Sequence, residues 1–445
     1  MFAEVDAPCD AERPSGADAC AFPSPRLLLR ASFPPMEALP RSAALAPARY
    51  ESLDAWRGVA CLAVVVVHAA SHLHLTQVPA AAGMSIVERL TRTILAWGWA
   101  GVPMFFVISG YCIAAAAHAG RARGDRPGEF FQRRFRRIFP PYWCCLAISA
   151  VVITLLGAIE ARLGVAPRHD PVIPATITPV HWIGNLTLTE TWLGHLTGAP
   201  FEWRNMVVGQ AWTLCYEEQF YAVVGLLLFV AGPRFARVLA AVTALILARW
   251  LLQSPNINSG FFFDGRWILF AAGLAVWFDI ACPRGATRWL TRGFLVVGLA
   301  WALRDPGVFL VRSQGVEHEW LVSFAFAAML LLLHRFDGAI ASHPLARPLA
   351  ARGTRCYSIY LVHMLAVRPI TLAFRWAGWT SLGLSLVVTI PLCVGGSLGA
   401  GWLFHRFVER RFLNAHPPGR RGAAAGAAPQ PRPQAAPAID LRRAA

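Results

Sequence analysis

One predicted apolar helix near the start of the chain carries an arginine and a histidine on the same face. Arg57 and His68 are eleven residues apart. At about 100° and 1.5 Å per residue they share a face and lie about 16 Å apart along the axis. Ionisable groups in a membrane-spanning helix usually face the protein interior or a water-filled cavity. The spacing therefore predicts one passage, with a guanidinium near the membrane surface and an imidazole deeper in the bundle.

His68 is a candidate general base, because a free imidazole titrates near neutral pH. Asp54 lies three residues before Arg57 and is placed to form an ion pair with it. The alternative role for His68 is structural, as a hydrogen-bonded contact between packed helices. The spacing alone does not choose between the two roles.

A second group is a cluster of arginines. Four of the five residues 133–137 are arginine, including Arg134 and Arg137. The guanidinium group can bind phosphate through two parallel hydrogen bonds. A phosphate-bearing cofactor such as coenzyme A would fit this cluster. The simpler alternative is a positively charged anchor on the cytoplasmic side, and this is favoured when the cluster is considered alone.

Two adjacent carboxylates, Glu217 and Glu218, stand near the head of another apolar run. Neighbours on a helix point about 100° apart, so only one of them is expected to face a given site. A carboxylate inside a membrane span is a functional candidate. Glu217 lies one turn before Tyr221 and could bond to it. Further along, Tyr360 and His363 share a helix face.

The composition indicates what must hold these groups. The chain has 445 residues, of which 56% are hydrophobic and 15% charged, with a mean hydropathy of +0.47. A soluble protein rarely combines these values. Apolar runs long enough to cross a membrane as helices recur along the chain. The alternation of polar and apolar residues that would indicate a membrane β-barrel is absent. We therefore predict an all-α membrane protein, a polytopic bundle of about ten transmembrane helices. The predicted spans are residues 55–74, 94–118, 141–163, 209–231, 235–253, 261–281, 288–304, 319–335, 355–376 and 382–405.

The net charge of +16 arises entirely from arginine, because the chain contains no lysine. The arginines between residues 121 and 137 favour a cytoplasmic loop, which predicts a multi-pass protein with both termini cytoplasmic. The expected location is the bacterial inner membrane. Nucleic-acid binding is not expected, since no recognition motif accompanies the charge. The ten cysteines lack metal-ligand spacing, so no metal site is expected.

Three regions follow. Residues 1–50 are predicted to be a disordered cytoplasmic leader, residues 51–412 a ten-helix membrane domain, and residues 413–445 a disordered cytoplasmic tail. The longest outside loop, about 164–208, mixes tryptophans with His181, Glu190 and other polar groups. It is suited to cover a carbohydrate-like ligand, or to form an aromatic belt at the membrane surface. The sequence leaves both open.

Taken in order, five segments resemble the acyltransferase-3 family of integral membrane O-acyltransferases. They are residues 53–68, 105–111, 134–140, 212–221 and 357–363. Arg57 and His68 match the family's Arg-x10-His pattern, and Arg134 and Arg137 match its Arg-x-x-Arg pattern. Cys215 stands where serine is more usual. Each segment is weak alone, but five in sequence are hard to attribute to chance.

The resemblance implies about ten helices and transfer of an acyl group, often acetyl, from cytoplasmic acyl-CoA. The acceptor would be a hydroxyl of a glycan, a lipid-linked sugar or a small molecule. Arg57, Arg134 and Arg137 would bind the acyl-CoA, and His68 with Glu217 or Glu218 would carry the catalysis, without a metal. Some members carry a fused extracytoplasmic hydrolase-like domain, and none is expected here.

Two other functions stay open. A secondary transporter or flippase for a saccharide or small molecule would also place charged groups in a midplane cavity, but no convincing internal repeat favours it. A membrane sensor or scaffold would tolerate substitution of Arg57, His68 and Arg134.

Overall fold

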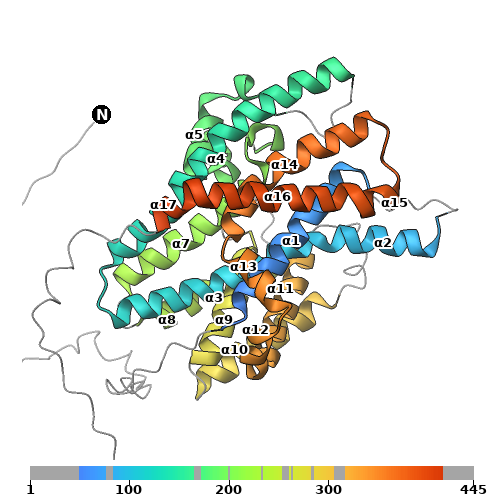
Figure 1. Ribbon diagram of the computed structural model, residues 1–445. Coiled ribbons are helices and arrows are strands. Elements are labelled where there is room, and N and C mark those ends of the chain that lie inside the picture. Colours follow the sequence, from blue (N-terminus) through green and yellow to red (C-terminus); the bar gives the residue numbers. More distant parts are fainter. Residues whose placement is uncertain are drawn as a thin grey trace, which may run out of the picture. The chain divides into compact units, whose positions relative to one another are not determined.

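The computed structural model describes residues 50–76, 84–164, 172–198, 201–231, 234–252, 260–261, 264–281, 285–304 and 316–413. Every regular element in these ranges is a helix, which confirms the all-α prediction (Figure 1). Nearly all of the predicted leader and tail lies outside the described residues, as do residues 165–171 of the outside loop.

Eight helices make up most of the length of the segments that could cross a membrane. They are α1 (Leu53–His72), α2 (Ile86–Ala96), α3 (Gly101–Ala122), α4 (Pro127–Leu163), α7 (Trp212–Val230), α11 (Val316–Leu333), α14 (Cys356–Trp376) and α16 (Ile390–Phe404). Shorter helices connect or flank them: α5 (Pro179–Thr187), α6 (Glu190–Thr197), α12 (Asp337–Ser342), α13 (Ala346–Gly353), α15 (Leu382–Leu384) and α17 (Arg410–Leu413). Two π-helical turns, Ser385–Thr389 and His405–Glu409, flank α16.

Seven described segments are long and apolar enough to cross a membrane. This confirms a polytopic membrane protein. The count of ten is not confirmed, because the other three predicted spans are 15 to 17 residues long: α8 (Phe235–Leu251), α9 (Trp267–Ala281) and α10 (Ala286–Ala302). A straight span needs about 20 residues. Nearly every side chain of α9 is buried, so its hydrophobicity reflects protein packing on all sides.

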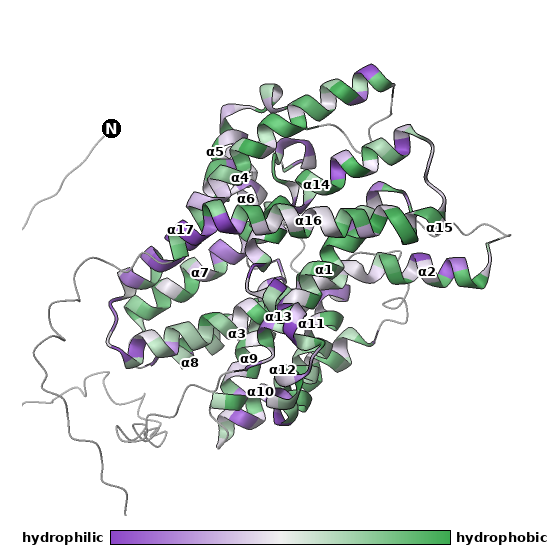
Figure 2. Ribbon diagram, viewed as in Figure 1, coloured by the Kyte–Doolittle hydropathy of each residue, from purple (hydrophilic) through white to green (hydrophobic). Residues whose placement is uncertain are grey.

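The chain is apolar in the middle of its helices and polar at their ends. In Figure 2, α16 is hydrophobic along most of its length and becomes hydrophilic towards α17. The third predicted span, 141–163, starts too late, because α4 begins fourteen residues earlier, at Pro127. Pro140 and Pro141 predict a helix boundary, because proline lacks the N–H of the helical ladder. The helix nevertheless continues through them, and it carries the arginine cluster on its first turns.

The helix α1 packs mainly against α13, α14, α3 and α16. Its N-terminal backbone is held by another element: the amides of Glu51 and Ser52 donate to the carboxylate of Asp337, at 2.5 and 3.0 Å. Glu51 and Ser52 lie directly before the first residue of α1, where the Asp337 carboxylate satisfies both amides and complements the positive end of the helix dipole. This contact fixes the end of α1 that carries Arg57.

Glycines bring α3 and α9 into backbone contact. A Cβ atom added to Gly110 would lie 2.0 Å from the carbonyl oxygen of Phe270, and one added to Gly273 would lie 1.9 Å from that of Val107. Neither position has room for a side chain. The small residues of segment 105–111 therefore permit the close helix contact expected of them.

We expect Gly110→Ala to destabilise the protein by about 1–3 kcal/mol, because the added methyl group must push backbone away from backbone. The measurement is the thermal unfolding midpoint of the purified protein in detergent. Gly399→Ala is the matched control, since a Cβ atom there meets nothing within 4 Å. Equal midpoints for the two variants would contradict this account of the α3–α9 contact.

Candidate active site

Five helices, α1, α3, α4, α7 and α14, enclose a cavity of about 320 Å³, here called the inner cavity. The structure brings together Arg57, Arg134, Arg137 and Glu217 on its wall, although they lie up to 160 residues apart. Other lining residues with polar groups are Ser109, Cys112, Thr213, Tyr221, Cys356, Tyr357 and Tyr360. The arginine cluster, the first carboxylate and the α1 guanidinium thus form one site.

Arg57 is held from two sides. Its Nη1 lies 2.5 Å from Oδ1 of Asp54, which is the ion pair that the sequence suggested, and its Nη2 donates to Sγ of Cys112 at 2.8 Å. A guanidinium can still donate from its remaining N–H groups. The two contacts therefore orient Arg57 towards the cavity without using all its hydrogen-bonding capacity.

Glu217 is the carboxylate that faces the inner cavity. Its Oε1 accepts hydrogen bonds from the hydroxyls of Ser109, at 2.8 Å, and of Tyr221. The guanidinium carbon of Arg134 lies 4.8 Å from the centre of the Tyr221 ring, a cation–π contact. Glu218 does not line the cavity, and its Oε1 is buried without a hydrogen-bond partner in the described structure.

A second cavity of about 900 Å³, here called the outer cavity, lies at the other ends of α1, α4 and α14. His68 lines it, together with the aromatic side chains of Phe201, Trp203 and Trp212. Its charged or titratable members are His72, Glu160, Glu202, Arg204, Arg368 and Arg375. Among the described residues, none lines both cavities. Arg57 and His68 therefore line separate cavities, whereas their spacing on α1 predicts a single passage.

A thin layer of hydrogen-bonded polar groups separates the cavities. Tyr360 lines the inner cavity, and its hydroxyl contacts the hydroxyl of Thr213 at 2.8 Å and donates to the backbone oxygen of Gln210 at 3.0 Å. Gln210 lines the outer cavity. We call Tyr360, Thr213 and Gln210 the partition. Tyr360 and Gln210, which line different cavities, are in direct hydrogen-bond contact there.

His68 contacts α14, the helix that carries Tyr360 of the partition. Its Nδ1 lies 2.7 Å from Nε2 of His363, and Nδ1 of His363 lies 2.7 Å from the backbone oxygen of Tyr360. His363 is completely buried, whereas His68 is partly exposed to the outer cavity. The sequence grouped Tyr360 with His363 but gave no sign that His68 would meet them.

Buried polar groups hold together the described part of the outside loop. Nδ1 of His181, on α5, lies 2.7 Å from Oε1 of Glu190, on α6, and burial raises the pKa of the Glu190 carboxyl to about 8. Asn185 is buried and accepts a hydrogen bond from the amide of Val207 at 3.0 Å. These contacts carry Trp203 to the rim of the outer cavity, where it is 60% exposed.

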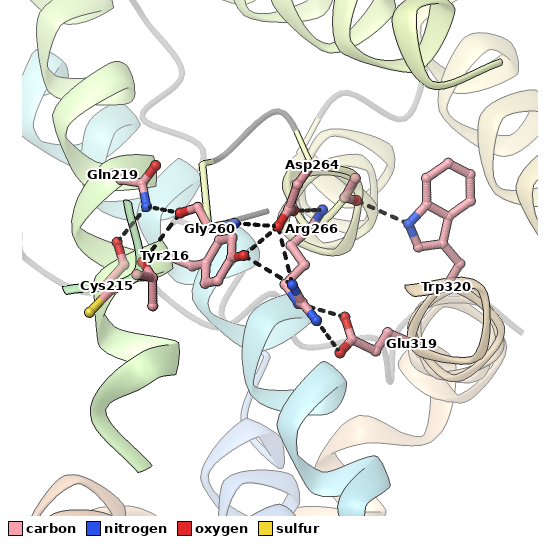
Figure 3. A network of polar contacts seen from close by, with 10 residues as sticks. Cys215, Tyr216, Gln219, Gly260, Asp264, Arg266, Glu319 and Trp320 are labelled. Carbon is pink, nitrogen blue, oxygen red and sulfur yellow. Dashed lines mark hydrogen bonds and ion pairs between the residues drawn. The ribbon is translucent and has the colours of Figure 1, made fainter. Parts of the chain in front are cut away.

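Figure 3 shows a charged network that the sequence did not reveal. Arg266 binds both carboxylate oxygens of Glu319, at 2.9 and 3.1 Å, and donates to the hydroxyl of Tyr216 at 3.0 Å. Asp264 accepts from Arg266 at 3.2 Å and from the Tyr216 hydroxyl. The guanidinium carbon of Arg266 also lies 5.1 Å from the Trp212 ring centre. The network therefore supports an aromatic wall of the outer cavity.

A sequence signal for this network existed. Arg266 and Glu319 stand near the outside ends of two predicted spans, 261–281 and 319–335, and opposite charges at the same membrane depth can pair. Among the described residues no cluster of three or more His, Cys, Asp or Glu side chains could hold a metal ion. The seven cysteines in the described ranges are free thiols.

We expect Arg266→Met to destabilise the protein by about 3–5 kcal/mol, because it leaves the buried carboxylates of Asp264 and Glu319 without a counter-charge. The control is Arg204→Met, whose ion pair with Glu202 is exposed and contributes little. Thermal unfolding in detergent measures both. Adding Glu319→Gln to Arg266→Met should recover part of the loss, and similar midpoints for the two single variants would refute the role of the network.

Comparison with known proteins gives a consistent result. A family model described as an acyltransferase domain matches residues 50–405. The Staphylococcus aureus (strain NCTC 8325 / PS 47) protein named O-acetyltransferase OatA is 25% identical over 301 residues, 62% of this chain and 47% of that protein. The chain thus spans about half the length of this relative.

Two rhizobial proteins are matched over more of their length. The exopolysaccharide production protein ExoZ of Rhizobium meliloti (strain 1021) is 27% identical over 348 residues, 74% of this chain and 91% of ExoZ. Nodulation protein 10 of Rhizobium leguminosarum bv. viciae is 24% identical over 298 residues, 62% of this chain and 74% of that protein. No solved structure matches the chain.

Proposed function

The chain belongs to the acyltransferase family whose model matches residues 50–405, which confirms the resemblance, and we propose that it is a membrane O-acyltransferase. It takes an acyl group, acetyl in the simplest case, from acyl-CoA on the cytoplasmic side and transfers it to a hydroxyl of a glycan or other glycosylated acceptor. The name of OatA supports O-acetyl transfer, and the name of ExoZ supports a polysaccharide acceptor.

One observation carries the proposal. Two cavities lie at opposite ends of the same helices, and Tyr360 on the wall of one donates a hydrogen bond to Gln210 on the wall of the other. Both cavities are lined by arginines and at least one carboxylate, but only the outer one adds the imidazole of His68 and the tryptophans Trp203 and Trp212. An enzyme that receives its donor from one side of a membrane and its acceptor from the other requires such a pair of half-sites.

The inner cavity suits the reactive end of acyl-CoA. Its volume of about 320 Å³ lies at the lower limit for small-molecule pockets, so it admits the acyl-pantetheine arm rather than the whole cofactor. The nucleotide phosphates would stay at the mouth, bound by Arg134 and Arg137, with Arg57 deeper in the cavity. This orientation makes the arginine-rich end cytoplasmic, in agreement with the positive-inside rule.

The outer cavity suits a sugar. Its volume of about 900 Å³ has room for one or more rings, and the flat faces of Trp203 and Trp212 suit the apolar faces of pyranose rings. Carboxylates and guanidinium groups on the same wall can bind hydroxyls. The outside loop would then cover the acceptor rather than serve only as an aromatic belt.

The chemistry follows from His68. The imidazole removes the proton of the acceptor hydroxyl as that oxygen attacks the thioester carbonyl. The carbon–sulfur bond breaks, and the coenzyme A thiolate takes up a proton from the imidazolium. Because a thioester is already activated, alignment of the two substrates supplies much of the remaining rate. Glu217 holds Tyr221 beneath Arg134 and so shapes the donor side.

The two substrates meet only if the acyl group passes the partition. Tyr360 is held there by two hydroxyl contacts, with Thr213 and with the backbone of Gln210. A rotation of the Tyr360 side chain would break a few hydrogen bonds, each of which contributes about 1 kcal/mol net to stability. The barrier to such an opening is therefore compatible with turnover.

We expect His68→Ala to lower acyl transfer by about 10²- to 10⁴-fold, the usual contribution of a general base. Membranes that contain the variant or the wild type are supplied with radiolabelled acetyl-CoA, and label is followed into a glycan fraction. Wild-type activity in the variant would remove His68 from the mechanism.

We expect Arg134→Gln combined with Arg137→Gln to raise the KM for acyl-CoA at least tenfold, because both lose a charged contact with phosphate. Arg133→Gln is the control: it lies in the same cluster but pairs with Asp125 and does not line the inner cavity. Equal KM values in the control and the double variant would contradict a specific phosphate site.

A transporter or flippase is the second candidate, because cavities on both sides of a partition also suit alternating access. The labelling assay separates the two functions. Label that stays in coenzyme A, while unmodified glycan crosses proteoliposomes that contain the protein, would favour transport.

A further inference from the structure

We infer that His363 is a positioning residue that fixes which nitrogen of His68 carries the proton, so that Nε2 of His68 keeps the basic lone pair. The inference rests on the proposed acyl transfer, in which His68 is the general base. It assigns His363 a role in the reaction without contact with either substrate.

The order of hydrogen bonds sets the tautomer. A backbone carbonyl can only accept, so Nδ1 of His363 must donate to the oxygen of Tyr360, 2.7 Å away. A neutral imidazole carries one N–H, which leaves Nε2 of His363 as an acceptor. That nitrogen lies 2.7 Å from Nδ1 of His68. His68 therefore carries its proton on Nδ1, and its lone pair is on Nε2.

The rings have the geometry of a directed hydrogen bond. Their planes are 6° apart and their centres 4.9 Å apart. The centre-to-centre distance is close to the nitrogen–nitrogen distance plus the two ring radii. The rings therefore meet edge to edge in almost one plane, which aligns the N–H of His68 with the lone pair of His363. Face-to-face stacking would not produce this short nitrogen contact.

The two histidines differ in burial, so only His68 can reach a substrate. His363 is 0% exposed and lines neither cavity, so it has no access to substrate or to bulk solvent. His68 lines the outer cavity, where the acceptor hydroxyl would lie. When Nε2 of His68 takes the hydroxyl proton, the charged ring still donates from Nδ1 to His363. Hydrogen bonds from charged donors are stronger than neutral ones, so His363 stabilises the imidazolium as it forms.

The same principle operates wherever a third group holds a catalytic imidazole in one tautomer. In serine proteases, loss of the correct tautomer lowers the rate by about 10⁴-fold although the geometry stays intact. In this protein the third group is a neutral histidine, fixed by the backbone of its own helix. The partition and the base are therefore coupled, because the carbonyl of Tyr360 orients His363.

The test compares substitutions of His363 that keep or remove the acceptor. His363→Met fills similar space without a strong acceptor, whereas His363→Gln can accept the Nδ1 proton of His68 with its amide oxygen. We expect the methionine variant to lower kcat at least tenfold, with the KM for acetyl-CoA changed less than twofold. The glutamine variant should recover most of kcat.

The pH profile gives a readout that packing would not change. His363→Glu offers a charged acceptor to His68, so the acidic limb of the rate profile should move to higher pH. The other titratable groups on the outer cavity stay the same in every variant: His72, Glu160, Glu202, Arg204, Arg368 and Arg375. Ser397→Ala is the matched control, because among the described residues its hydroxyl bonds to the backbone oxygen of His363, at 3.5 Å, and not to either ring. It should leave both kcat and the profile unchanged.

The experiments distinguish a failure of the proposed function of His68 from a failure of the role inferred for His363. If His68→Ala keeps wild-type activity, the proposed function of His68 fails whatever His363 does. If His68→Ala is inactive, but the methionine and glutamine variants lose activity equally, or neither loses any, the role of His363 alone is overturned. If the methionine variant does not accumulate in membranes, the glutamate variant decides: an unmoved acidic limb would overturn the inference.

Discussion

A buried polar group in a membrane protein has no water to bond with and must find its partners within the protein. The polar groups around Tyr360 meet this constraint by hydrogen bonding to one another. Its hydroxyl contacts Thr213 and Gln210, and its backbone oxygen accepts from His363, which bonds to His68. Each of these polar groups has a hydrogen-bond partner, because an unpaired polar group is costly in surroundings of low dielectric constant. The chain of contacts both closes the path between the cavities and orients the proposed base.

Helix packing places this chain of contacts. The helix α1 contacts α3, α13, α14 and α16, and an external carboxylate, Asp337, holds its N-terminal amides. Glycine contacts then set the distance between α3 and α9. Because interiors are closely packed and deform little, these contacts position Ser109 and Cys112 against Glu217 and Arg57. The inner cavity thus depends on backbone contacts outside it.

The outer cavity is organised by charge. Arg266, Asp264 and Glu319 link α7, the start of α9 and α11 on one side, as Figure 3 shows, and the guanidinium supports Trp212. Glu190 and Asn185 order the loop that carries Trp203. Buried charges are expensive unless paired. The pairing therefore explains how a polar cavity can be built beside apolar helices.

Several features were determined by the sequence alone. Hydropathy is local and additive along the chain, so residues such as those of α1 and α16 predicted an all-α membrane protein. Helical periodicity paired Asp54 with Arg57 and Glu217 with Tyr221, because partners one turn apart meet in any helix. The number of spans was less predictable, since α9 is as apolar as a membrane helix but is surrounded by protein.

Only the tertiary structure decided how the site is divided. Arg57 and His68 share a helix face, yet they line different cavities, because Tyr360 and Gln210 come from other helices to close the space between them. The contact of His68 with His363 joins residues 295 positions apart, and no local pattern encodes such a distance. Spacing within one helix specifies where a side chain points, whereas the neighbours that it meets depend on how all the helices pack.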